Sequence, residues 1–290
     1  MTATLVAGID GSPESLAAAD WAAREAVRRG ARLHLVHAWL WQPLAHPYAP
    51  DRQIEADRAQ TVVREAEAAV TGQYPDLDVS ASLVSDDTVP ALLGLAEEAG
   101  MLVIGTRGHG ALRGFLLGSY GQQVIAAAPC PVVSVRRTTG EVTPPRTGEV
   151  VVGQQGGVEE SRAVLGFAFE AAAARGASVR AVRAWSLPPV YAYSPTSMWV
   201  ADQLGGLEPY ERAALEQALE PWREKFPDVP VVEQVQMGSA GQTLLSAASG
   251  ADLLVVGRRV RHSAVGTRIG SVAHAALHHA PCPVAVVPHD

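Results

Sequence analysis

Four residues, Gly105, Gly108, Gly118 and Ser119, have the types and the spacing to hold an anion. Glycine has no Cβ, so a backbone that contains it can turn sharply and approach a ligand closely. Gly118 and Ser119 come shortly before an alanine-rich segment that is typical of a helix. The free N–H groups at a helix start attract negative charge, and the serine hydroxyl adds a hydrogen-bond donor. The chemistry that this pattern favours is the binding of a phosphate group.

A carboxylate, Asp10, follows an earlier apolar run. Residues 4–9 predict a buried strand. Ser12 is then the expected N-cap of a helix that has Pro13 at its first position. Asp10 is a candidate for hydrogen bonding to a ligand, and the alternative is that it only forms a local turn or cap.

The elements that must position these residues alternate between strand and helix. In the first half of the chain, short apolar runs predict strands at residues 4–9, 33–39, 77–84, 101–104 and 131–135. Between them lie segments of helical periodicity, the first with an apolar face of Leu16, Ala19, Ala23, Ala26 and Val27. This alternation predicts an α/β fold with a parallel sheet, right-handed crossovers and helices on both faces. Such doubly wound sheets bind ligands beyond the carboxyl ends of their strands.

The chain contains this pattern twice. Residues 30–39 match residues 176–185, and residues 127–133 match residues 279–285. The two copies are too long to be the repeats of a solenoid, so they predict a duplicated domain. We expect one domain over residues 1–137, a second over residues 148–290, and between them a linker rich in Pro, Gly and Thr at residues 138–147.

The second copy keeps only part of the anion-binding pattern. Three residues of the pattern recur, namely Gly257, Gly270 and Ser271. Gln155 replaces the Asp10 carboxylate, and Val260 stands where the first copy has Gly108. A β-branched residue disfavours a positive φ and puts a side chain where a phosphate would approach. We therefore expect the second copy to bind a nucleotide weakly or not at all.

Arginines accompany both glycine loops. The first loop carries Arg107, and the second carries Arg258, Arg259, Arg261 and Arg268. Guanidinium groups can neutralise phosphate charge and make charge-assisted hydrogen bonds to it. The alternative is that these are ordinary solvated side chains of a surface loop.

The composition excludes several classes of protein. A net charge of −7 over 290 residues argues against a general nucleic-acid binder. No apolar run approaches the ~18 residues that predict a membrane span. Lys225 is the only lysine, which excludes a Walker-type phosphate loop. No nucleophile–base pair and no metal-ligand spacing emerges. We expect a cytoplasmic protein, at most a weak ATPase, without membrane or nucleic-acid partners.

The pattern of Gly105, Gly108 and Gly118-Ser119, together with Asp10, resembles the nucleotide-binding signature of the universal stress protein family, in its ATP-binding branch. The resemblance implies two doubly wound parallel five-stranded sheets of strand order 3-2-1-4-5, with the nucleotide between strands 1 and 4. It implies nucleotide contacts from Gly8, Asp10, the backbone of Ala38, Gly105, Gly108, Gly118, Ser119 and the backbone of Tyr120. The bulk of Tyr120 departs from the family pattern.

For function, the resemblance implies regulation in a stress or dormancy response through ATP occupancy. Mg²⁺ or Mn²⁺ is an optional companion of the phosphates, because the sequence shows no dedicated carboxylate cage. Two alternatives stay open: a slow ATPase or adenylate-handling enzyme, and an interaction scaffold that binds no nucleotide. The family also implies pairing through strand 5, which would give an internal pseudo-two-fold dimer of the two copies. A homodimer of whole chains and an unidentified protein partner are further options.

Overall fold

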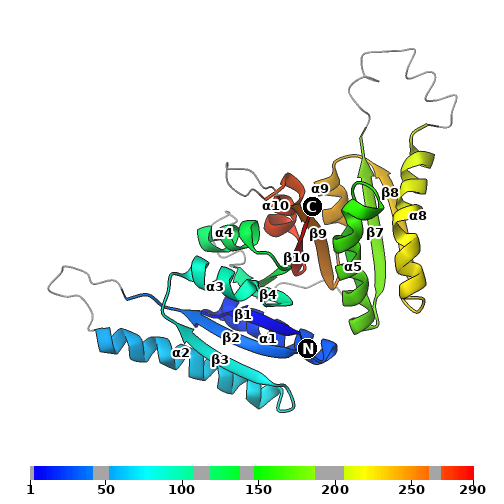
Figure 1. Ribbon diagram of the computed structural model, residues 1–290. Coiled ribbons are helices and arrows are strands. Elements are labelled where there is room, and N and C mark those ends of the chain that lie inside the picture. The colour runs from blue at the N-terminus through cyan, green and yellow to red at the C-terminus, as the bar shows by residue number, and fades with distance from the viewer. Residues whose placement is uncertain (1–2, 42–51, 107–117, 138–146, 187–205, 261–268) are drawn as a thin grey trace. The chain divides into compact units, whose positions relative to one another are not determined.

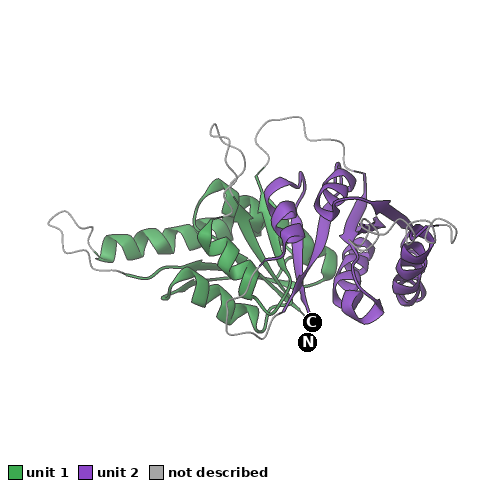
Figure 2. Cartoon of the chain, turned by 90° about the horizontal axis from the view of Figure 1, so that it is seen from above, with its two compact units in different colours: residues 1–142 green, residues 143–290 purple. Residues whose placement is uncertain are grey.

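The computed structural model describes residues 3–41, 52–106, 118–137, 147–186, 206–260 and 269–290. Within these ranges ten strands and eight helices alternate along the chain (Figure 1). The chain divides into two compact units, Met1–Val142 and Thr143–Asp290, which Figure 2 colours separately. The predicted linker lies almost wholly outside the described residues. In the part that is described, no helix is both long and apolar enough to cross a membrane.

Unit 1 is an α/β unit with five parallel strands. Along the chain its elements are β1 (Thr4–Gly8), α1 (Pro13–Arg29), β2 (Arg32–Ala38), α2 (Arg52–Gln73), β3 (Val79–Val84), α3 (Thr88–Ala96), β4 (Met101–Thr106), α4 (Ser119–Ala127) and β5 (Val132–Arg136). Their order across the sheet is β3-β2-β1-β4-β5, and every pairing between neighbours is parallel. This is the order that the family resemblance implies.

Helices cover both faces of this sheet. Helices α1 and α2 pack against each other, and α3 packs against α4 (Figure 1). Right-handed crossovers place the two pairs on opposite faces, because the chain moves outward from β1 to β3 and then returns to β4 and β5. The carboxyl ends of all five parallel strands therefore lie at one edge of the sheet, and the turns that follow them lie there too.

The buried face of α1 differs from the predicted one. Leu16 and Val27, which we expected in the apolar face, are 41% and 53% exposed. The three predicted alanines, Ala19, Ala23 and Ala26, are buried, and Ala18 and Ala22 are buried beside them. Because interiors are close-packed, a face of small side chains lets the helix axis approach the sheet closely. This close approach shapes the site described below.

Unit 2 repeats the arrangement. Its elements are β6 (Glu149–Gly153), α5 (Val158–Arg175), β7 (Ser178–Trp185), α8 (Glu208–Lys225), β8 (Val231–Met237), α9 (Ala240–Ala247), β9 (Leu253–Arg259), α10 (Ser271–His279) and β10 (Val284–His289). The order β10-β9-β6-β7-β8 again has parallel neighbours, so both units have the strand order 3-2-1-4-5. The predicted pseudo-two-fold pairing of the two copies stays a prediction.

Candidate functional site

The first group of predicted binding residues lies where β1, β2 and β4 end. Strands β1 and β4 are parallel neighbours, with Leu5 beside Met101. Gly8 is the last residue of β1, and Ala38 is the last residue of β2 on its other side. The turn after β1 therefore lies between the carboxyl ends of its two neighbours. Doubly wound sheets bind their ligands at such a position.

Asp10 is held in this turn by the residues that cap α1. The Ser12 N–H and the Ser12 hydroxyl both donate to Asp10 Oδ1, at 2.9 and 2.5 Å. The Asp10 N–H in turn donates to Ser15 Oγ at 3.2 Å. Gly11 makes the turn possible with a left-handed φ of 77°. Asp10 therefore does form the local turn that we gave as the alternative to ligand binding. Both bonds from Ser12 end on the same carboxylate oxygen, Oδ1.

The electrostatics of the turn keep Asp10 ionised. Partial burial alone would raise its pKa, but the hydrogen bonds from Ser12 and Ser15 and the nearby His37 outweigh that effect and lower the pKa. His37 lies near the end of β2, and its Nδ1 is 2.8 Å from the Ile9 carbonyl oxygen. His37 was not among the residues that the sequence predicted for this site. Its position one residue before Ala38, at a strand end, is the signal that could have found it.

Replacing Asp10 by asparagine tests the charge of the turn. Because folding lowers the Asp10 pKa, the carboxylate stabilises the fold above its ordinary pKa of 3.8, and this contribution is lost as the pH falls through the lower folded value. We expect D10N to have a lower urea midpoint than the wild type at pH 7, and the two midpoints to converge below about pH 4. A difference that stays constant from pH 7 to pH 3 would contradict this account.

Gly105 has a packing role in addition to the ligand contact that the sequence predicts, and that contact stays a prediction. It belongs to β4, where it pairs with Val135, and does not open the loop. A Cβ on Gly105 would lie 2.5 Å from the Glu14 carbonyl carbon and oxygen and 2.7 Å from the Ser15 nitrogen. Glycine is therefore required here because the first turn of α1 packs directly on the strand. This contact also brings Gly105 next to the turn that holds Asp10.

The second group of predicted residues lies at the start of α4. Gly118 is the N-cap, Ser119 and Tyr120 are the first helical residues, and all three are exposed. No described atom lies within 4 Å of a Cβ built on Gly118. The first N–H groups of a helix have no acceptor within it, so they are available to an anion. The predicted contacts of Arg107 and Gly108 lie outside the described residues.

A serine–histidine cluster lies on β2 and β3, although the sequence analysis found no nucleophile–base pair. The Ser82 hydroxyl is 2.9 Å from His34 Nε2, and Ser80 Oγ is 2.8 Å from His34 Nδ1. Burial lowers the pKa of His34, which keeps the ring neutral at pH 7. A catalytic triad has a carboxylate behind the histidine, whereas this ring has a second serine. We interpret the cluster as side-chain hydrogen bonding that links β2 to β3. The sequence did not reveal it, because His34 is far from the two serines along the chain.

The counterpart residues of unit 2 occupy equivalent backbone positions. Gly270 is the N-cap of α10, Ser271 is its first residue, and no described atom lies within 4 Å of a Cβ on Gly270. Gln155, in the place of Asp10, is exposed. A Cβ on Gly257 would meet His289 Nε2 at 2.7 Å, so this glycine faces a side chain and not a backbone.

The cations and metal ligands of the predicted sites are only partly described. Arg258 is buried and Arg259 is exposed, and the other two arginines of that loop lie outside the described residues. Among the side chains that the structure describes, no three His, Cys, Asp or Glu residues are grouped to hold a metal ion.

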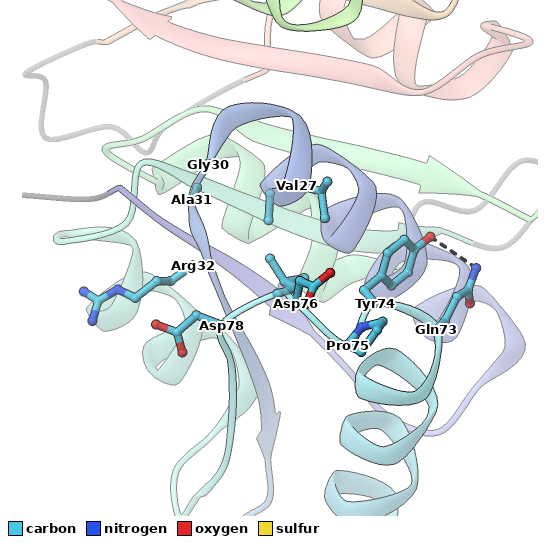
Figure 3. A pocket seen from close by; sticks show the side chains of 11 residues that line it. Val27, Gly30, Ala31, Arg32, Gln73, Tyr74, Pro75, Asp76 and Asp78 are labelled. Atoms are coloured by element: carbon cyan, nitrogen blue, oxygen red, sulfur yellow. Dashed lines mark hydrogen bonds between the residues drawn. The ribbon is translucent and has the colours of Figure 1, made fainter.

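A hollow of about 580 Å³ lies at the other end of the strands of unit 1 (Figure 3). It is lined by residues at the end of α1, the end of α2 and the amino ends of β2 and β3, namely Ala26, Val27, Gly30, Ala31, Arg32, Gln73, Tyr74, Pro75, Asp76, Leu77 and Asp78. In parallel strands the amino ends lie opposite the carboxyl ends. The hollow is therefore separate from the Asp10 turn.

The tyrosine of this hollow joins α2 to α1. The Tyr74 hydroxyl donates to Asp20 Oδ1 at 2.7 Å, and burial together with this bond raises the Tyr74 pKa to about 12. Folding stability from the bond is present below the ordinary tyrosine pKa of about 10 and is lost as the pH rises towards 12. We expect Y74F to be less stable by about 1 kcal/mol at pH 7, with the difference closing above about pH 10. Urea unfolding measures it, and Y210F, at an exposed tyrosine, is the control.

Comparison with known proteins assigns both units to one family. The model of the universal stress protein family matches residues 1–136 and 148–288. Universal stress protein Rv2005c of Mycobacterium tuberculosis is 33% identical over 289 residues, which cover 97% of this chain and 96% of that protein. A universal stress protein of Mycolicibacterium smegmatis is 31% identical over 294 residues, which cover 98% and 96%.

Solved structures show the same fold. The crystal structure of a universal stress protein from Archaeoglobus fulgidus has a TM-score of 0.68 and 16% identity, and the match covers 99% of this chain and 98% of that one. A crystal structure described as a putative universal stress protein from Pseudomonas aeruginosa has a TM-score of 0.64 at the same identity, with 100% and 94% covered.

Proposed function

The chain belongs to the universal stress protein family, and on that basis we propose that its first unit binds ATP beyond the carboxyl ends of β1 and β4. Asp10 would accept a hydrogen bond from the nucleoside through its Oδ2. Gly8 and the backbone of Ala38 would flank the base and sugar. The start of α4, from Gly118 to Tyr120, would hold the ribose and phosphates, together with Gly105, Arg107 and Gly108.

The observation that carries this proposal is the open space at Gly118. The protein packs tightly around Gly105, and its own backbone explains that glycine. No described atom comes near a Cβ on Gly118, yet this residue caps a helix whose first N–H groups are available to an anion. A glycine at a helix start, with its Cβ position clear of described atoms, leaves room for a phosphate to approach.

We further propose that occupancy of this site, and not turnover, is the output of the protein. ATP would stabilise the bound form of unit 1 in proportion to its concentration, and a protein partner would then recognise that form. A role in a stress or dormancy response follows from the family, and the expected cytoplasmic location stays a prediction.

The test is a nucleotide count followed by calorimetry. The full chain is purified and denatured, the released nucleotide is quantified, and stripped protein is titrated with ATP. One ATP per chain is the expected result. Two per chain would show that Gln155 and Val260 are tolerated and that unit 2 also binds. Phosphate release would support the ATPase alternative. If the protein carries no bound nucleotide and also gives no binding heat with ATP, the proposal is contradicted and the scaffold alternative remains.

A further inference from the structure

In unit 2 an arginine crosses the turn that corresponds to the Asp10 turn of unit 1. Arg183 lies near the end of β7, and its Nη1 donates to Gln154 Oε1 at 2.6 Å and to the Gly156 carbonyl oxygen at 3.0 Å. Its Nε donates to Glu211 Oε2 on α8 at 2.5 Å. The Arg183 and Glu211 side chains are only 16% and 27% exposed. The turn after β6 is therefore tied to both β7 and α8.

The residues of this tie have different counterparts in unit 1. The match of residues 30–39 with 176–185 places His37 opposite Arg183. The motif Tyr-Pro-Asp at residues 74–76 matches Phe-Pro-Asp at residues 226–228, and counting back along the two helices places Ala59 opposite Glu211. Ala59 is 4% exposed. Unit 1 thus has a short imidazole and a methyl group where unit 2 has an ion pair.

We propose that unit 2 contains a latent anion site at Arg183, which Glu211 occupies as an internal ligand. The planar guanidinium carries a pair of donors, Nε and Nη2, on one edge, and this edge matches the spacing of oxygens in a carboxylate or phosphate. Gln154 and Gly156 hold Nη1, so this edge is oriented in advance. In the present structure the Nε of this edge donates to Glu211. The ligand class that fits the same edge is a small phosphate-bearing anion.

Glu211 outcompetes dissolved anions for Arg183 because it belongs to the same chain. An internal group competes at an effective concentration in the millimolar range or above, so a dissolved anion gains little by replacing it. In addition, a second carboxylate, Glu160, is bound to this turn. Its Oε2 accepts a hydrogen bond from the Gly157 N–H at 2.9 Å, and its negative charge also disfavours an anion. Arg183 therefore binds no phosphate while the ion pair with Glu211 is made. This cause is separate from the replacement of Asp10 by Gln155 and of Gly108 by Val260.

The experiment removes the internal ligand and measures the anion. Glu211→Ala gives α8 the residue that unit 1 has, and inorganic pyrophosphate is titrated calorimetrically into the full chain at low salt. We expect one site more than in the wild type, with at least tenfold tighter binding than any wild-type binding at unit 2. The control is the double variant Arg183→Gln/Glu211→Ala, which should lose this extra site. Glu211→Gln, which keeps the shape of the side chain, serves if Glu211→Ala does not fold.

Three results would overturn the proposal. The first is that neither Glu211 variant gains a pyrophosphate site. The second is that the extra site persists when Arg183 is also replaced. The third is that the wild type already binds pyrophosphate in a manner that Arg183→Gln removes. Because each result is a difference within unit 2, it is independent of whether unit 1 binds ATP, which the nucleotide count tests separately.

Discussion

Replacing Gly105 by alanine is expected to lower the stability of unit 1 by about 3 kcal/mol, at the upper end of the usual cost of overpacking. The new Cβ would lie 2.5 Å from the Glu14 carbonyl carbon and oxygen. A flexible side chain could turn away, but this obstacle is the backbone of the first turn of α1. The helix start must therefore shift, and the turn that holds Asp10 shifts with it. A fall in melting temperature of about 10 °C would accompany this loss.

The matched control is the same change in the other unit. Gly257 occupies the equivalent position in β9, but its Cβ would meet the end of the His289 ring and Val164 Cγ2, at 2.7 and 3.1 Å. A side chain can rotate, so G257A should lose less than half as much stability as G105A. Urea unfolding followed by circular dichroism compares them. Equal losses would mean that the backbone contact at Gly105 relaxes as easily as a side chain does.

Replacing Gly118 by valine is expected to weaken ATP binding at least ~100-fold, which corresponds to about 2.7 kcal/mol. The proposed phosphate site requires a close approach to the start of α4, and a branched side chain would occupy that space. Stability should change little, since no described atom lies within 4 Å of the Cβ position. The loss of a glycine N-cap costs about 1 kcal/mol or less. Calorimetric titration with ATP measures the effect.

Gly270→Val is the control for Gly118→Val. Both glycines cap a nine-residue helix with extended backbone angles, φ −54° and ψ 153° at Gly118 and φ −63° and ψ 158° at Gly270. The capping cost is therefore the same in both variants, whereas only Gly118 lies in the proposed nucleotide site. We expect G270V to bind ATP like the wild type. Equal affinity in G118V and the wild type would contradict the placement of the phosphates at α4.

The strand order and the duplicated units could be anticipated from the sequence. The order 3-2-1-4-5 came from the family resemblance, because periodicity shows which segments are strands but not which strands are neighbours. The prediction of the buried face of α1 was partly wrong, since Leu16 and Val27 are exposed. A helical repeat defines a stripe of residues, but only packing decides how wide a part of that stripe faces the sheet.

The candidate site was anticipated to a different degree at each residue. Asp10 and Gly118 could be selected because each stands next to a strand end or a helix start. The packing role of Gly105 was missed, because a glycine that approaches a ligand and one that approaches another backbone have the same sequence signature. His37 was overlooked, because its interaction with the Ile9 carbonyl oxygen joins two strands across 28 positions.

The amino-acid sequence alone therefore determined the elements, their duplication and the candidates for anion binding. These depend on local periodicity, capping and internal similarity, which are properties of neighbouring residues. Only the tertiary structure decided which glycine the fold itself requires and which side chains close the turn of unit 2. Arg183 and Glu211 are 28 residues apart, and Gly105 packs against Glu14 in the first turn of α1, much earlier in the chain. Such contacts depend on how the sheet brings distant segments together, and no local pattern encodes them.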